Sequence, residues 1–208
     1  EKKITNYLFF MPHTETLPYD FFSPSKETKN KRIQAISDIQ SKRNFLLICS
    51  IQAFMNPCSG LGHILPVNSF KVGQDFNREE FIKEIQNSGY ERTEIVSAIG
   101  HYSLRGSIID IYLSSSNFPI RIELLNKKIE SLRTFNANSQ LTIERINSFS
   151  TLPANEYPIN DKGIELFKKN WRQKFDVHED DSDIFTAVSN GKRHEGVEIY
   201  LPLFFNSK

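Results

Sequence analysis

Short apolar runs and one helical pattern define the first part of the chain. The runs at 7–10 and 45–49 are continuously apolar, which is typical of strands that are buried on both faces. Between them, isoleucines recur at every third position and predict a helix over 27–40. The order strand, helix, strand predicts a βα unit of a parallel sheet.

The pattern changes near residue 67. Phe70 to Val72 predicts a brief strand, and Asn77 followed by Glu80 is a capping pair for a helix over 78–87. Apolar and polar residues then alternate in short segments, which predicts consecutive antiparallel strands. These strands are expected at 93–97, 107–113, 120–125, 129–135 and 141–149. A helix followed by such strands predicts an α+β domain over 67–150.

The last part of the chain returns to helical patterns. Asp161 is expected to cap a helix that runs to Phe175, a second helix is expected over 183–189, and 197–205 is expected to close the chain as a strand. The sequence therefore predicts an α/β fold class. We expect 1–66 and 151–208 to form one discontinuous domain, with 67–150 inserted into it as a second domain.

Composition permits packed cores and limits the possible partners. Hydrophobic residues make up 38% of the 208 residues, and 17 phenylalanines supply large apolar side chains. Lys and Arg number 26 against 25 Asp and Glu, so no basic excess drives non-specific binding of nucleic acid. Two cysteines make no disulfide framework. Without a signal peptide or an apolar run near 20 residues, the chain is expected to be soluble and cytoplasmic, with no membrane partner.

Candidate chemistry of the catalytic kind is missing from the sequence. There is no Gly-rich phosphate loop with its Lys and Ser/Thr, and the five histidines are scattered without ligand spacing. No nucleophile is marked out by a neighbouring base. We therefore expect no cofactor, no metal site and no catalytic residues, and the expected function is that of a binding module.

The stretch from Gly100 to Leu125 is the most patterned part of the chain. Its first strand alternates, and its second strand opens at Pro119 after a Ser-rich turn. This predicts a hairpin that carries Arg105 just before its first strand and Arg121 in its second. We expect the hairpin to be exposed and the two arginines to have no local acidic partner except Glu123, which flanks Arg121. From the pattern alone, a solvated hairpin with ordinary surface charges is the simpler interpretation.

The motifs LRGSIIDIY, PIRIELL and KKIESLRTFN resemble the second domain of the excision-repair protein UvrB, which also occurs in the bacterial transcription-repair coupling factor family. Asn136 stands where that pattern has Asp. Further matches are ETLPYDFFSPS, SGYER, LPANEYP and GVEIYLPLFF, so the resemblance covers almost the whole chain. After Asp20 there is no room for the insertion with which UvrB probes DNA, and YLPLFF is typical of the coupling factor. The chain is therefore identified as similar to the coupling factor's amino-terminal UvrB-like module.

This resemblance implies a fold and a partner. It implies a degenerate nucleotide-binding-like domain, without nucleotide, that carries an inserted UvrA-binding domain. Its UvrA contacts fall on Arg105, Arg121 and Leu125, and at Leu125 the family usually has an aromatic residue. The implied function is non-catalytic recruitment of UvrA to stalled RNA polymerase in transcription-coupled nucleotide excision repair.

Three functional hypotheses follow from these observations. In the first, the chain docks UvrA, while its ATP-driven parent contacts RNA polymerase and double-stranded DNA through domains that are absent here. The alternative is a DNA-contacting damage-recognition module like UvrB itself. The third is a scaffold whose surface arginines bind nothing.

Overall fold

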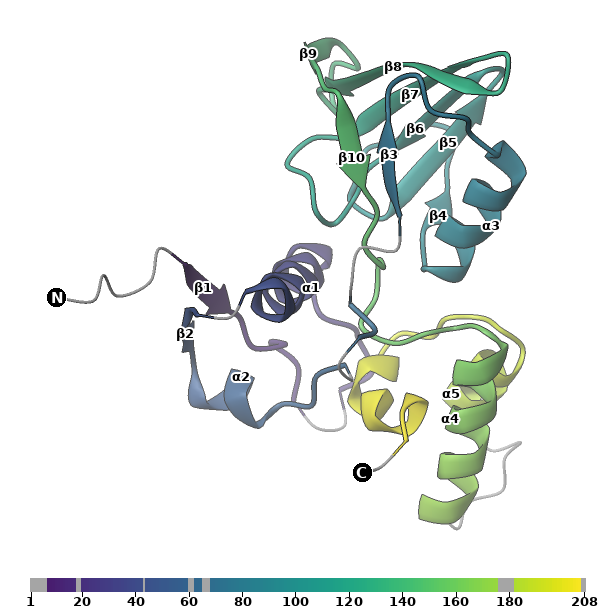
Figure 1. Cartoon of the computed structure of the whole chain (residues 1–208). Coiled ribbons are helices and arrows are strands. Elements are labelled where there is room, and N and C mark those ends of the chain that lie inside the picture. The colour runs from purple at the N-terminus through teal and green to yellow at the C-terminus, as the bar shows by residue number, and fades with distance from the viewer. Residues whose placement is uncertain are drawn as a thin grey trace, which may run out of the picture. The chain divides into compact units, whose positions relative to one another are not determined.

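The computed structural model describes residues 7–17, 20–42, 44–59, 62–64, 68–175 and 182–206. The chain divides into two compact units (Figure 1). The end unit combines Glu1–Ile64 with Asn155–Lys208, and the central unit is Leu65–Ala154. Both contain helices and strands, so the architecture is mixed α/β, with several separate sheets.

The end unit begins with a parallel pair of strands. β1 (Leu8–Met11) pairs with β2 (Leu46–Cys49), and α1 (Lys26–Ser41) connects them, which confirms the predicted βα unit. α2 (Ile51–Met55) follows directly. The prediction that both strands are buried on two faces was wrong, because Leu8, Phe10, Leu46 and Ile48 are all mostly exposed. Within the described residues this sheet has only these two strands, and one of its faces is uncovered.

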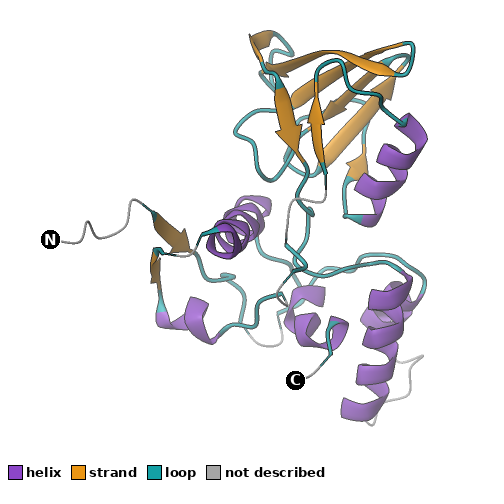
Figure 2. Ribbon diagram, viewed as in Figure 1, coloured by secondary structure: helices purple, strands orange, loops and turns teal. Residues whose placement is uncertain are grey.

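The regular elements described in the carboxyl-terminal part of the end unit are helices joined by loops (Figure 2). α4 (Asp161–Lys174) is capped by the Asn160 side chain rather than by Asp161, and α5 (Asp183–Ser189) lies where it was predicted. The strand expected at 197–205 is instead a 3-10 helix, η2 (Val197–Phe204). It begins after Gly196, which adopts φ 80°, and its buried apolar residues recur at helical spacing, so this face packs on α4 and α5. The resulting core contains Phe167, Trp171, Phe185, Val188, Val197, Leu201 and Phe204.

The central unit is built on a six-stranded sheet with the order β4-β5-β6-β7-β8-β9. Neighbouring strands are antiparallel except β4 and β5, which are parallel. A separate antiparallel pair joins β3 to β10. The elements are β3 (Ser69–Lys71), α3 (Arg78–Asn87), β4 (Glu91–Arg92), β5 (His101–Arg105), β6 (Ile108–Ile111), β7 (Ile120–Leu125), β8 (Lys128–Phe135), β9 (Thr142–Arg145) and β10 (Ser148–Ser150).

Two of the predicted strands of the central unit were wrong. No strand covers 93–97: the Thr93 hydroxyl donates to the carbonyl of Ile95 at 3.1 Å, and the chain bends there. The strand expected over 141–149 is divided into β9 and β10, which belong to different sheets.

One face of the six-stranded sheet forms the core of the central unit. Ile109 and Ile111 of β6 and Ile120 and Ile122 of β7 are buried on it, which confirms the predicted alternation. α3 and the β3–β10 pair cover this face and contribute Phe81, Ile85, Phe70 and Phe149 to the same core (Figure 2). The residues between these isoleucines must therefore project from the opposite face, where the candidate site lies.

Candidate protein-docking site

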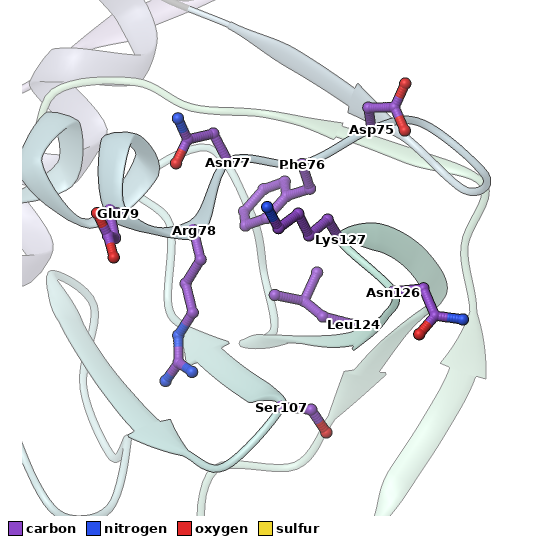
Figure 3. A pocket seen from close by; sticks show the side chains of 9 residues that line it. All are labelled: Asp75, Phe76, Asn77, Arg78, Glu79, Ser107, Leu124, Asn126 and Lys127. Carbon is purple, nitrogen blue, oxygen red and sulfur yellow. The ribbon is translucent and has the colours of Figure 1, made fainter.

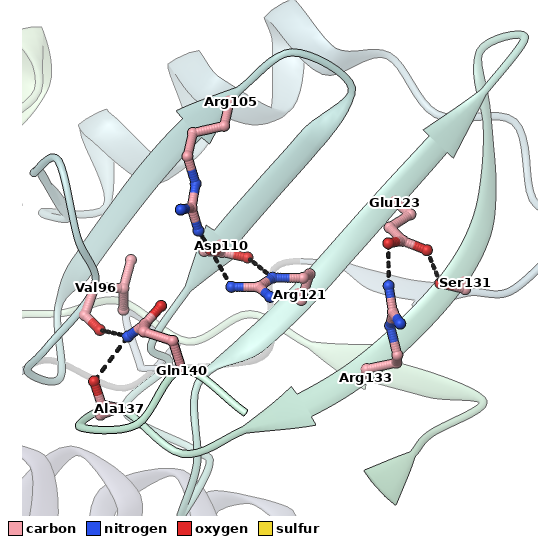
Figure 4. A network of polar contacts seen from close by, with 9 residues as sticks. All are labelled: Val96, Arg105, Asp110, Arg121, Glu123, Ser131, Arg133, Ala137 and Gln140. Carbon is pink, nitrogen blue, oxygen red and sulfur yellow. Dashed lines mark hydrogen bonds and ion pairs between the residues drawn. The ribbon is translucent and has the colours of Figure 1, made fainter. Parts of the chain in front are cut away.

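Polar residues from three adjacent strands meet on the second face of the sheet. In the register of the sheet, Asp110 of β6 lies beside Arg121 of β7, and Arg121 lies beside Arg133 of β8. Since cross-strand neighbours on one face have side chains within contact distance, this register builds a charged row across the sheet. Figure 4 shows the row, with Arg105 reaching toward it from β5.

The carboxylate of Asp110 joins the two predicted arginines. Asp110 is 0% exposed. Arg121 donates from Nε to Oδ1 at 2.7 Å and from Nη2 to Oδ2 at 2.9 Å, and Arg105 donates from Nη2 to Oδ2 at 2.5 Å (Figure 4). The carboxylate is therefore satisfied by three charge-assisted hydrogen bonds, which are stronger than bonds between neutral groups. The side chain of Arg105 stays 50% exposed, whereas that of Arg121 is 17% exposed.

Arg121 is held from a second direction by an aromatic ring. Its guanidinium carbon lies 4.6 Å from the centroid of the buried Phe135 ring on β8. A cation over a ring face is attracted by the ring quadrupole. The hydrogen bonds to Asp110 raise the pKa of Arg121 above its ordinary value, although desolvation opposes them. Arg121 is thus a permanently charged group in a fixed position.

A second ion pair continues the row. Glu123 accepts a hydrogen bond from the Ser131 hydroxyl at 2.6 Å and forms an ion pair with Arg133 (Figure 4). Both charged side chains are about three-quarters buried. Glu123 therefore pairs with Arg133, and Arg121 pairs with Asp110.

Leu125 ends β7 and is 54% exposed. It lies four residues beyond Arg121 on the same strand, about 13 Å away at the usual strand rise. The alternation of β7 places it on the same face as Arg121 and Glu123, because Leu124 packs against the core. The structure thus brings Arg105 and Arg121 together and leaves Leu125 as an exposed apolar residue farther along the same face.

The geometry corrects two expectations about this region. The hairpin was expected to be exposed, but β6 and β7 are central strands and Asp110 is fully buried. The arginines were expected to have no acidic partner except Glu123, but both bind Asp110. The sequence carried part of this signal, because the alternation places Asp110 and Arg121 each opposite the apolar residues of its own strand, and the register of the sheet then brings the two together.

A depression elsewhere in the central unit has mixed charge. It is open, measures about 850 Å³, and lies between the start of α3 and the β7–β8 turn. Figure 3 shows Phe76 and Leu124 among its lining residues, with Asp75, Arg78 and Lys127 around them. Acids and bases alternate there without a defined chemical centre. Across the described ranges, no three His, Cys, Asp or Glu residues gather as metal ligands would.

The described part of the chain contains no helix of the length and apolarity that crossing a bilayer requires.

Comparison with a known family now defines the central unit. Residues 69–157 match the family model described as the UvrB interaction domain. The chain carries a UvrB interaction domain. The match includes the six-stranded sheet and the whole Arg105–Asp110–Arg121 cluster. This match confirms the resemblance of the motifs in this region to UvrB.

Beyond the UvrB interaction domain, nearly the whole chain is similar to curated relatives. The chain is 34% identical to the transcription-repair-coupling factor of Escherichia coli K12 over 196 residues, which covers 92% of this chain. It is 33% identical to that of Haemophilus influenzae over 198 residues and 27% identical to that of Rickettsia bellii over 209 residues, covering 93% and 96% of this chain. The chain spans about 17–18% of the length of these curated relatives.

Proposed function

We propose that this chain is a non-catalytic docking module that binds UvrA and, as part of a longer protein, recruits it to stalled RNA polymerase in transcription-coupled excision repair. In this proposal the end unit is a degenerate nucleotide-binding-like domain that supports the UvrB interaction domain. Contacts with RNA polymerase and double-stranded DNA belong to parts of the longer protein outside this sequence.

The observation that carries the proposal is the arginine pair on the sheet. Arg105 and Arg121 share one buried carboxylate, Arg105 keeps half of its side chain exposed, and Leu125 is an exposed apolar residue farther along the same face. Guanidinium groups bind carboxylates through paired hydrogen bonds, and binding energy concentrates in a few Arg and apolar anchors. This face suits a protein partner that presents carboxylates beside a small apolar pocket.

The competing hypothesis is a DNA-contacting damage-recognition module. Binding to the phosphate backbone needs several cations that are free to displace counterions. Here the net charge is +1, and Arg121 and Arg133 are each engaged by an acidic side chain on the same face. These observations favour the protein partner.

The test is a comparison of variants in binding to purified UvrA. Arg105→Ala combined with Leu125→Ala removes the two most exposed site residues and leaves the Asp110–Arg121 pair in place. We expect UvrA affinity to fall by about 1–3 kcal/mol per anchor residue, the usual range for interface hot spots. Calorimetry measures the affinity, and a DNA gel shift with the same proteins tests the competing hypothesis.

Arg92→Ala is the matched control, because Arg92 is an exposed arginine on β4 of the same sheet. It should leave UvrA affinity unchanged. If the double variant binds UvrA as well as the unmodified chain does, the site is wrong. If the unmodified chain shifts DNA and does not bind UvrA, the damage-recognition hypothesis replaces the proposal.

A further inference from the structure

A fully buried carboxylate is an expensive group, and stability alone does not explain Asp110. Removing an ion from water costs several kcal/mol, and replacing a buried ion pair by apolar residues is often neutral or stabilising. Asp110 lies on a strand whose other face already supplies the core through Ile109 and Ile111. Its three hydrogen bonds go only to arginines, and the Ser103 hydroxyl, its cross-strand neighbour on β5, has no partner among the described residues.

We propose that Asp110 is a positioning residue of the docking site, which holds Arg105 and Arg121 in one fixed arrangement before the partner binds. This inference rests on the proposed function, and it adds a residue that never touches the partner. Asp110 is 0% exposed, so it can act only through the two arginines.

The geometry explains how one carboxylate orders two long side chains. Asp110 binds two nitrogens of Arg121. The guanidinium carbon of Arg121 also lies over the Phe135 ring, 4.6 Å from its centroid. Arg105 shares Oδ2 with Arg121, so its guanidinium is fixed relative to that of Arg121. Arg105 donates one of its five N–H groups to Asp110, and the other donors can bind a partner carboxylate.

Fixing the two arginines in advance lowers the cost of binding. An arginine that is free in solution loses rotamer freedom when a partner immobilises it, and a pre-organised side chain has lost that freedom already. The carboxylate also has an opposing effect, because it reduces the positive charge that attracts an acidic partner. The two effects predict opposite results when the charge of Asp110 is removed, which makes the inference testable.

The experiment is a double-mutant cycle in the full chain, read as affinity for purified UvrA. Asp110→Asn keeps the size of the side chain and removes its charge. We expect affinity to fall about tenfold, mainly through faster dissociation, although the face becomes more positive. In an Arg105→Ala, Arg121→Lys background, the same Asp110→Asn change should have little further effect, because both guanidinium groups that Asp110 positions have been removed.

The outcomes separate this inference from the proposed function. Equal loss in both backgrounds, or unchanged or tighter binding by folded Asp110→Asn, overturns the positioning role. If Arg105→Ala with Leu125→Ala also leaves UvrA affinity unchanged, the docking site itself is wrong. Should Asp110→Asn fail to fold, Asp110→Glu takes its place in the cycle, since it keeps the charge and moves the carboxylate by one methylene.

A second readout does not need the partner. In the unmodified chain, the Nε–H of Arg121 should give a resolved, slowly exchanging NMR signal, because it donates to a buried carboxylate at 2.7 Å. Asp110→Asn should broaden or remove this signal while backbone amide signals of the sheet stay in place. An Arg121 signal that is equally protected in folded Asp110→Asn counts against the inference.

Discussion

At the scale of single residues, Asp110 changes what arginine substitutions mean. Removing Arg121 takes away two of the three hydrogen bonds on a carboxylate that has no access to water. A buried charged group left partly unsatisfied costs at least about 2–3 kcal/mol. Arg121→Ala is therefore a stability variant as well as a binding variant, whereas an arginine that is only an exposed docking residue would change stability by no more than about 0.5 kcal/mol.

We accordingly expect Arg121→Ala to destabilise the chain more than Arg105→Ala does. Arg105 contributes one hydrogen bond from a half-exposed side chain, and its loss leaves the two-point contact of Arg121 intact. Urea unfolding of both variants checks this order. A double variant, Asp110→Asn with Arg121→Gln, should recover part of the loss because no buried charge remains. Equal stability of the two single variants would show that Asp110 does not depend on Arg121.

The burial of His63 should make the stability of the end unit depend on pH. Its ring lies edge-on to Phe205 with 5.5 Å between centroids, and burial lowers its pKa below the ordinary value of 6.5. A histidine whose folded-state pKa is lowered takes up its proton more readily when the chain is unfolded. Its neutral form therefore contributes stability that is present above pH 6.5 and is lost as pH falls through the folded-state pKa.

Trp171 can report this transition, because it is the single tryptophan of the chain and lies in the core of the end unit. Thermal melts followed by its fluorescence should shift to lower temperature as the pH falls below 6.5. In His63→Leu the part of this shift that His63 causes should disappear. An identical pH dependence in the two proteins would exclude His63 as its source.

At the scale of elements, a buried ion pair fixes α1 within the end unit. Arg32 on α1 donates to both carboxylate oxygens of Glu156, at 2.5 and 3.1 Å, and to the carbonyl oxygens of Pro12 and Pro57. The Arg32 side chain thus joins the helix to three segments: the one after β1 through Pro12, the one after α2 through Pro57, and the one before α4 through Glu156. Arg32 and Glu156 are both buried.

Breaking this pair should therefore be costly, and removing all of it should cost less. Arg32→Ala leaves Glu156 as an unpaired buried charge, for which we expect a loss of about 3–5 kcal/mol. Arg32→Leu with Glu156→Leu removes both charges and should recover much of that loss, as seen when buried pairs are replaced by apolar groups. Chemical denaturation followed by Trp171 fluorescence compares them. Lys31→Ala is the control, because the Lys31–Glu27 pair on the same helix is exposed and contributes little.

Sequence patterns predicted elements well where one period was unambiguous. The isoleucines of β6 and β7 alternate, and the structure buries those that share a face. The strand predicted for 197–205 was wrong because a continuous apolar run fits either a strand or a helix. Only the packing of this segment on α4 and α5 selects the 3-10 helix. The apolar runs at β1 and β2 were correctly predicted as strands. Their exposed face could not be predicted, because a continuously apolar strand does not show which of its faces is covered.

The site was predictable in its residue types and not in its contacts. The motif marked Arg105 and Arg121, but the role of Asp110 depends on the register of β5, β6 and β7. A charged residue between Ile109 and Ile111 indicates exposure by pattern, and here the register buries it beneath two arginines. Pairing across strands is the information that a single sequence does not display.

At the scale of the whole molecule, the central unit has its own core and should fold alone. Its contacts continue past residue 150. The buried Tyr90 hydroxyl donates to the carbonyl of Leu152 at 2.7 Å, the amide of Ala154 donates to the carbonyl of Ser88 at 2.8 Å, and the Leu152 side chain is buried. Burial raises the pKa of Tyr90 to about 12, so this hydroxyl stays protonated and donating in the folded unit.

Two excised fragments, 65–154 and 65–150, should differ in stability. The shorter one leaves the Tyr90 hydroxyl without its acceptor and loses the buried Leu152 side chain, which together should cost at least about 2 kcal/mol. Urea unfolding followed by circular dichroism measures the difference. Leu152→Ala in the longer fragment is the control, since it removes the apolar contact and keeps the carbonyl, so its stability should fall between the two. If both fragments unfold at the same urea concentration, residues 151–154 add nothing, and if neither folds, the central unit depends on the rest of the chain.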